Sequence, residues 1–182
     1  MINLYYHKIE KTSVANGTGI RVVLWVSGCS LHCKGCQNPE TWGRNSGKLF
    51  DDEAKKELFD ALDKSYIQGI TFSGGHPLEE YNLNDVYILI KEIKECFPNK
   101  DIWLYTGLTF DNMLGLIANN LEIVDDSLPV LLEIVKLCDV IVDGAYVERL
   151  KDIRLKWRGS SNQRVIDVQK SIEEGKIIPY NN

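Results

Sequence analysis

The sequence predicts an α/β protein with a parallel sheet and outer helices, and two observations carry this prediction. Short apolar runs alternate along the chain with segments of helical periodicity, and glycine or cysteine closely follows four of these runs. Strands that alternate with helices form right-handed βαβ units, in which the strands are parallel. A chain of 182 residues with 44% hydrophobic residues can bury a sizeable core, so we expect one domain over residues 1–182.

The apolar runs are the expected strands. The first, at 22–26, is continuous and rich in β-branched residues, as in a strand buried on both faces, and it stops at Ser27-Gly28. Further strands are expected at 69–72, 102–105 and 140–142, followed by a short last strand at 165–168.

Helices are expected between these strands, where apolar residues recur at helical spacing. Asp51 or Asp52 would cap the first helix, and Asn84 would cap the second, which would stop before Pro98. Two more helical segments are expected at 111–119 and 127–137.

The residues that follow the strands point to one site. Cysteines follow the first strand, Gly74-Gly75 the second, Thr106-Gly107 the third and Asp143-Gly144 the fourth. In open α/β sheets and barrels, ligands bind at the carboxyl edge of the strands, where such loops converge. We therefore expect the functional site at this edge.

Charge and hydropathy exclude several classes of partner. The net charge of −5 argues against a nucleic-acid partner, because such proteins usually carry an excess of basic residues. The longest apolar runs are far too short to span a bilayer, and the first residues do not form a signal peptide. We expect a soluble, cytoplasmic protein with no membrane partner.

Three of the five cysteines lie within eight residues. Cys29, Cys33 and Cys36 have the spacing C-x3-C-x2-C, which is typical of a metal centre, either zinc or an iron–sulfur cluster. Structural zinc needs a fourth ligand, from His32 or a remote cysteine, whereas a cubane cluster on three cysteines leaves one iron open to a substrate. The spacing and the location at a strand end favour the open cluster.

The triplet, together with Ser73-Gly74-Gly75 after the second strand, resembles the radical S-adenosylmethionine (SAM) enzymes. Two further segments narrow the resemblance to the activating proteins of anaerobic ribonucleoside-triphosphate reductases, which are glycyl-radical-enzyme activases. These segments are Asn38-Pro39-Glu40-Thr41-Trp42 and Arg158-Gly159-Ser160-Ser161-Asn162-Gln163.

The resemblance implies a partial (β/α) barrel and a [4Fe-4S] cluster on Cys29, Cys33 and Cys36, with SAM on the iron that lacks a protein ligand. Reductive cleavage of SAM would give a 5′-deoxyadenosyl radical, which takes a hydrogen atom from a glycine in the large subunit of the reductase. A low-potential donor such as flavodoxin or ferredoxin would supply the electron. No side chain would be catalytic beyond the cluster and SAM.

The same resemblance assigns residues to the bound SAM. Gly35, Cys36 and Gln37 would border it, and Gly74-Gly75 would let the backbone approach it closely. Thr106 and Asp143 would contact its ribose or methionine part, or would only cap the turns that follow their strands.

Two positions depart from the family pattern. His76 stands where the family more often has an acidic residue, and a neutral imidazole supplies no negative charge for the methionyl ammonium group. A contact with SAM and a surface or turn-capping role therefore both stay open for His76. Thr18 stands where the family often has proline, which lowers the rigidity of a turn.

For the remaining polar and aromatic residues, the sequence predicts only a contact or a degree of burial. Arg158, Asn162 and Gln163 would contact the partner or the methionyl carboxylate, or form an ordered polar cover. Trp25 and Trp103 lie in apolar strand patterns and are expected in the core. Trp42 is expected beside the cysteine loop.

Cys96 and Cys138 fall at helix ends beside apolar residues, and we expect both to be buried thiols. Two other functions stay open on the sequence. One is a radical SAM enzyme for a small molecule, which would need a closed substrate pocket. The other is a zinc-binding module without catalysis.

Overall fold

The structure, a computed structural model, describes residues 2–119 and 127–181, and in these residues a mixed seven-stranded sheet has the order β3-β1-β2-β4-β5-β6-β7. The strands are β1 (Tyr5–Ser13), β2 (Ile20–Val26), β3 (Lys48–Leu49), β4 (Ile67–Gly74), β5 (Asp101–Tyr105), β6 (Val140–Asp143) and β7 (Arg164–Asp167). The four neighbours β2, β4, β5 and β6 are parallel, as predicted. The strands β1, β3 and β7 pair antiparallel with their neighbours at the two sides.

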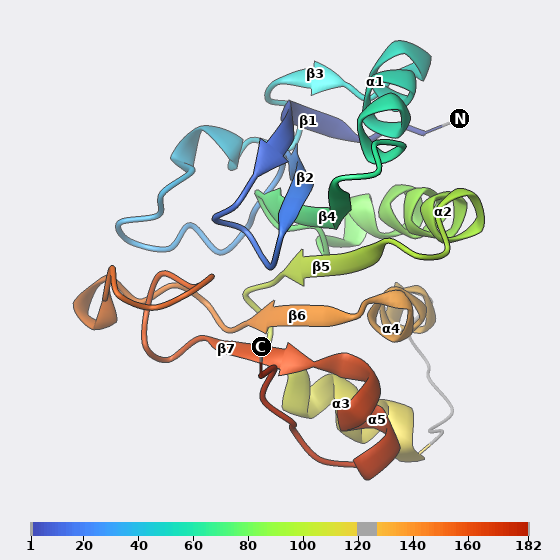
Figure 1. Ribbon diagram of the computed structural model, residues 1–182. Coiled ribbons are helices and arrows are strands. Elements are labelled where there is room, and N and C mark those ends of the chain that lie inside the picture. Colours follow the sequence, from blue (N-terminus) through green and yellow to red (C-terminus); the bar gives the residue numbers. More distant parts are fainter. Residues whose placement is uncertain (1, 120–126, 182) are drawn as a thin grey trace.

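Helices connect and cover the strands (Figure 1). They are α1 (Asp52–Leu62), α2 (Glu80–Cys96), α3 (Phe110–Asn119), α4 (Ser127–Leu137) and α5 (Val168–Glu174), with short 3-10 turns η1 (Pro39–Thr41) and η2 (Glu148–Leu150). The side chain of Asp51 accepts a hydrogen bond from the Ala54 amide at 2.9 Å, so the expected cap of α1 is confirmed. In the described parts of the chain, none of the helices combines the length and the hydropathy of a membrane span.

Side chains of the parallel strands alternate between the two faces of the sheet. Val22, Leu24 and Val26 of β2 join the main core, to which all five helices contribute. Trp103 of β5 lies in a second, smaller cluster, where its ring packs edge-on against Trp157 and Tyr180 at 5.2 Å each. The segments that carry Trp157 and Tyr180 therefore cover the face opposite the helices.

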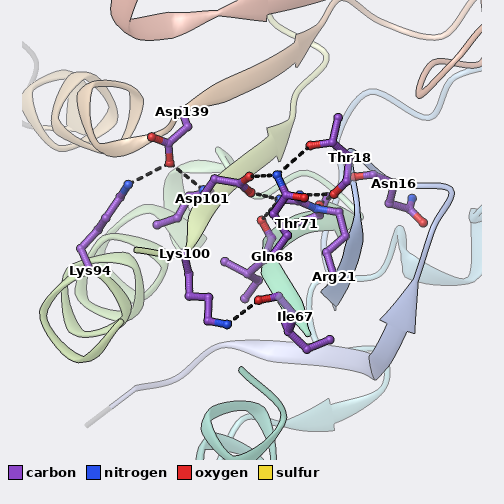
Figure 2. Close-up of polar contacts among 12 residues, drawn as sticks. Asn16, Thr18, Arg21, Ile67, Gln68, Thr71, Lys94, Lys100, Asp101 and Asp139 are labelled. Atoms are coloured by element: carbon purple, nitrogen blue, oxygen red, sulfur yellow. Dashed lines mark hydrogen bonds and ion pairs between the residues drawn. The ribbon is translucent and has the colours of Figure 1, made fainter. Parts of the chain in front are cut away.

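A polar network joins the amino ends of the strands (Figure 2). Arg21 is fully buried and donates hydrogen bonds to the Thr71 hydroxyl, to the carbonyls of Thr18 and Ile70, and to the Asp101 carboxylate. Its guanidinium also lies 5.1 Å from the Trp103 ring. One arginine thus links β2, β4 and β5 at the edge opposite the predicted site.

The expected partial barrel is not confirmed as such, because the described sheet is open. Its outermost strands, β3 and β7, lie at opposite ends of the strand order. The N-terminal strands β1 and β3 were not predicted, because β1 is polar and half-exposed and lacks the apolar run of a buried strand.

Helix α2 begins at Glu80, so the predicted cap at Asn84 is wrong. Asn82 in its first turn is buried, and the Asn82 side-chain amide donates to the carbonyls of Ser27 and His76, at 3.0 and 3.2 Å. This polar anchor replaces the apolar pattern on which the prediction depended.

Two burial predictions are also wrong. Cys96 is exposed because it is the last residue of α2 and faces solvent, whereas Cys138 is buried as expected. Trp25 is only half-buried, since alternation along β2 turns it away from the main core, and its indole donates to Glu10 at 3.1 Å. Trp103 is fully buried, as predicted.

Candidate active site

The loop of residues 27–47, which we call the cysteine loop, leaves the carboxyl end of β2 and closes at its own base. The Gly28 amide donates to the Thr41 carbonyl at 2.7 Å, and the Cys29 amide donates to the Trp42 carbonyl at 3.0 Å. Gly28 has a φ of +93°, and a Cβ there would lie 2.5 Å from the Tyr81 hydroxyl. Only glycine fits this turn, which directly precedes Cys29, the first cysteine of the triplet.

The three cysteines of the triplet are free and half-buried. Burial raises the pKa of the Cys29 thiol, and the backbone amides of Leu31 and His32 oppose this rise. The Asn38 amide donates to the Cys36 sulfur at 3.4 Å. Amide hydrogen bonds to sulfur are typical of iron–sulfur sites, so this donor set fits a cluster.

Within residues 2–119 and 127–181, no three side chains of the His, Cys, Asp and Glu types form a ready single-ion site. Trp42 packs beside the cysteine triplet, as expected, with its ring 4.6 Å from the ring of His32.

Gly74, the last residue of β4, and Gly75 lie against the end of β2. The Gly75 amide donates to the Val26 carbonyl and the His76 amide to the Gly28 carbonyl, at 2.8 and 2.7 Å. A Cβ at Gly75 would lie 2.4 Å from the Gly28 oxygen. This close backbone approach accounts for the glycine pair, and contact with SAM stays a prediction.

His76 lies in a chain of polar contacts that joins three strand ends. It is 5% exposed, which excludes a surface role, and its Nε2 is 2.8 Å from the Thr106 hydroxyl after β5. Its Nδ1 is 3.3 Å from Glu79, and Glu79 accepts hydrogen bonds from both the amide and the hydroxyl of Ser30 at 2.7 Å. A carboxylate from the loop after β4 therefore holds the residue next to Cys29.

Burial lowers the pKa of His76 by disfavouring the imidazolium, although Glu79 opposes this effect. Burial opposes ionisation of Glu79, but the hydrogen bonds from Ser30 and the nearby His76 outweigh it and hold the pKa of Glu79 below its usual value. Sequence reasoning missed Glu79. The only available signal was its spacing of three residues from His76, at the start of a helix.

Asp143 lies at the end of β6 and is 1% exposed. Its carboxylate accepts from the Phe110 amide at 2.8 Å, at the start of α3, and from Arg164 Nε at 3.0 Å. The two aspartates Asp143 and Asp111 raise the pKa of the Arg164 guanidinium. The structure thus gives Asp143 a capping and pairing role, and a contact with SAM stays a prediction.

Arg158, Asn162 and Gln163 hold the segment between β6 and β7 together. Gln163 accepts from the amides of Gly159 and Ser160, at 2.9 and 3.1 Å, and donates to the Gly144 carbonyl. Arg158 donates to the Gln163 carbonyl, and Asn162 donates to the Ala145 carbonyl, both at 2.8 Å. They form an ordered polar cover at the carboxyl edge.

A cavity of about 450 Å³ lies between this cover and the sheet. Trp25 and Tyr105 line it from the sheet, Gln37 from the cysteine loop, and Trp157 and Arg158 from the cover. The Tyr105 hydroxyl donates to the Trp157 carbonyl at 2.6 Å, and burial raises the pKa of this tyrosine. Gln37, the residue after Cys36, thus borders a cavity that is large enough for part of a ligand.

Comparisons with known proteins place this site in a family. Residues 15–166 match the family model described as "4Fe-4S single cluster domain". The chain is 42% identical over 160 residues to the anaerobic ribonucleoside-triphosphate reductase-activating protein of Enterobacteria phage T4. The aligned region covers 88% of this chain and 92% of the relative. It is 41% and 40% identical over 162 residues to the proteins of that name from Salmonella typhimurium and Escherichia coli K12, covering 88% of this chain and 96% of each relative.

The chain belongs to the anaerobic ribonucleoside-triphosphate reductase-activating proteins. The resemblance predicted from the sequence is confirmed. Because the matched 4Fe-4S domain includes the whole cysteine triplet, membership of this family supports an iron–sulfur cluster as the metal centre.

Proposed function

We propose that this protein is a radical SAM activase that generates a glycyl radical on an anaerobic ribonucleoside-triphosphate reductase. The observation that carries the proposal is the cysteine loop, whose three thiols follow β2 at the carboxyl edge and whose Gln37 lines the adjacent cavity. The printed names of the relatives supply the reductase as partner.

Cys29, Cys33 and Cys36 would hold the [4Fe-4S] cluster. When bound, this group would supply the electron that cleaves SAM to methionine and the 5′-deoxyadenosyl radical, which then takes a hydrogen atom from a glycine of the reductase. Flavodoxin or ferredoxin would be the donor in the cytoplasm. The open sheet would correspond to the partial barrel of the radical SAM enzymes.

The chain's own residues would bind and orient the substrate. Gly35 and Gln37 would border SAM from the cysteine loop, and Gly74-Gly75 would border it from the loop after β4. His76, Thr106 and Asp143 follow the next strand ends, where they would meet its polar groups. The cover between β6 and β7 would exclude water from the cavity.

The cluster is tested by anaerobic purification and assay of iron and sulfide. We expect about four irons for each chain and absorption near 400 nm, and substitution of any triplet cysteine by alanine should abolish both. Cys96→Ala is the matched control, because this exposed thiol lies at the far end of α2. Loss of iron in Cys96→Ala would contradict the ligand assignment.

The activity is tested with the reductase. Reduced protein, SAM and the large subunit of the reductase should give the doublet of a glycyl radical in electron paramagnetic resonance. If the cluster-loaded, reduced protein cleaves SAM but gives no such signal with the reductase, the activase function is wrong.

A further inference from the structure

The segment between β6 and β7 carries charge of the opposite sign to the rest of the protein. Residues 148–158, which we call the basic loop, hold five basic and two acidic side chains, a net charge of +3 in a chain of −5. Whether these basic side chains can attract a partner depends on where they lie and whether acidic residues neutralise them, which the structure shows.

The basic loop lies against the cysteine loop. Lys34 of the cysteine loop is 3.8 Å from Glu148, and a Cβ on Gly35 would lie 2.8 Å from the same side chain. Residues of the basic loop, among them Lys151 and Ile153, form one wall of the 450 Å³ cavity that Gln37 also lines. Both loops project from the same edge of the sheet, at the left of Figure 1.

Most of the positive charge in the basic loop is not neutralised within the protein. Arg154 pairs with Asp152 at 2.8 Å. Arg149, Lys151 and Lys156 are exposed, and none has a carboxylate within ion-pair distance in the part of the chain that the structure describes. Three unpaired cations on one short segment attract a negatively charged surface.

An apolar side chain projects from the centre of these charges. Ile153 is 90% exposed, more than any other large hydrophobic residue among those described, and Leu150 in the same loop is 37% exposed. This exposed apolar side chain among charged residues offers a protein partner an apolar contact within a polar rim.

We propose that the basic loop is the docking surface for the large subunit of the reductase, through an acidic surface that carries an apolar hollow for Ile153. This proposal rests on the proposed function. The glycine of a protein substrate must reach the cavity, and the basic loop forms a wall of that cavity. An electron donor needs only to approach the cluster, so the reductase is the partner that must contact this wall.

The test measures binding of cluster-loaded protein to the purified large subunit of the cognate reductase. At about 0.1 M salt, Arg149→Glu/Lys156→Glu should weaken binding at least about tenfold, because the screening length there is about 10 Å. At about 1 M salt, where this length is about 3 Å, the difference from the wild type should nearly vanish. Ile153→Ser should weaken binding at both salt concentrations.

Lys64→Glu/Lys91→Glu is the matched control, since it makes the same change of charge at two other exposed lysines, one just after α1 and one in α2. It should bind like the wild type. Arg149→Gln/Lys156→Gln should show a smaller loss, and it replaces the reversal variant if that variant does not fold.

Three results would overturn the proposal. They are wild-type affinity in the charge variants, an equal loss of affinity in the control, and slower reduction by flavodoxin with unchanged reductase binding. The last result would assign the surface to the electron donor. Cleavage of SAM by the wild-type protein alone tests the proposed function separately, so failure of either proposal is seen without the other.

Discussion

At the scale of single residues, the contacts of Glu79 link two loops of the site. Its carboxylate accepts from the amide and hydroxyl of Ser30 and lies beside His76, which in turn contacts Thr106. Hydrogen bonds to a charged group are stronger than those between neutral groups. Glu79 therefore fixes the start of the cysteine loop, next to Cys29, relative to β4 and β5.

Replacement of Glu79 by alanine should loosen the cysteine loop. We expect exchange of the Ser30 amide hydrogen to become at least about tenfold faster in Glu79→Ala, because its acceptor is lost. Glu79→Gln keeps an oxygen acceptor and should show a smaller change. Exposed Glu80, replaced by alanine, is the control, and hydrogen exchange followed by mass spectrometry or NMR is the measurement. Unchanged exchange in Glu79→Ala would contradict this positioning role.

The buried imidazole of His76 makes stability depend on pH. Its pKa is lowered in the folded protein by burial, so the unfolded chain binds a proton more readily. Stability should therefore fall as the pH drops below the unfolded value of about 6.5. We expect the melting temperature to decrease by a few degrees more in the wild type than in His76→Gln between about pH 7.5 and 5.5. Parallel curves for the two proteins would show that folding does not lower the pKa of His76.

The sequence predicted which residues could carry chemistry better than it predicted their contacts. The cysteine triplet and Gly74-Gly75 are local patterns, so their place at strand ends follows from the chain itself. Glu79 and Arg164 act through residues far away in the sequence, Ser30 and Asp143, and a single sequence does not reveal such pairs. Asp143 shows the same limit, because only the structure reveals its cap on α3.

At the scale of elements, prediction succeeded where apolar periodicity decides the structure. The strands β2, β4, β5 and β6 bury continuous apolar runs, and α1 has a side-chain cap, so their approximate positions were correct. The strands β1 and β3 and the first turn of α2 depend on pairing and on polar anchors such as Asn82, which leave no periodic signal. The network of Arg21 at the amino edge was not predicted for the same reason.

Removal of Arg21 should destabilise the three strands that it joins. Arg21→Met keeps the volume but leaves Thr71, two carbonyls and Asp101 without their buried donor. Breaking such a buried pair costs about 3 kcal/mol or more of unfolding free energy, which denaturant unfolding measures. Lys56→Met, which breaks an exposed pair with Asp60, should leave the free energy of unfolding nearly unchanged. A similar small loss for both variants would contradict the structural role of Arg21.

At the scale of the whole molecule, one face of the sheet carries the core and the other face carries the candidate site. Helices and the main core occupy one face, whereas the cavity and the polar cover occupy the other. Gln163 makes several of the hydrogen bonds that hold the cover, to Gly144, Gly159 and Ser160. The order of the cover therefore depends strongly on one side chain.

Gln163→Ala should expose the basic loop to protease. The variant loses the bonds that close the cover, while the core on the other face is unchanged, so trypsin should cut after Lys151, Arg154 or Lys156 several times faster. Gln169→Ala is the control, because Gln169 bonds to the carbonyls of Lys136 and Cys138 outside the cover. Equal cleavage of both variants, mapped by mass spectrometry, would contradict the role of Gln163.

The separation of the core from the cysteine loop has a consequence for how the protein responds to loss of its metal centre. No residue between 28 and 49 contributes to the main core, all of whose members lie in described parts of the chain. We therefore expect the chain to fold without the metal centre, in contrast to small zinc domains that unfold without metal. We therefore expect that protein which has lost its cluster keeps its fold and can take up iron and sulfide again without new synthesis.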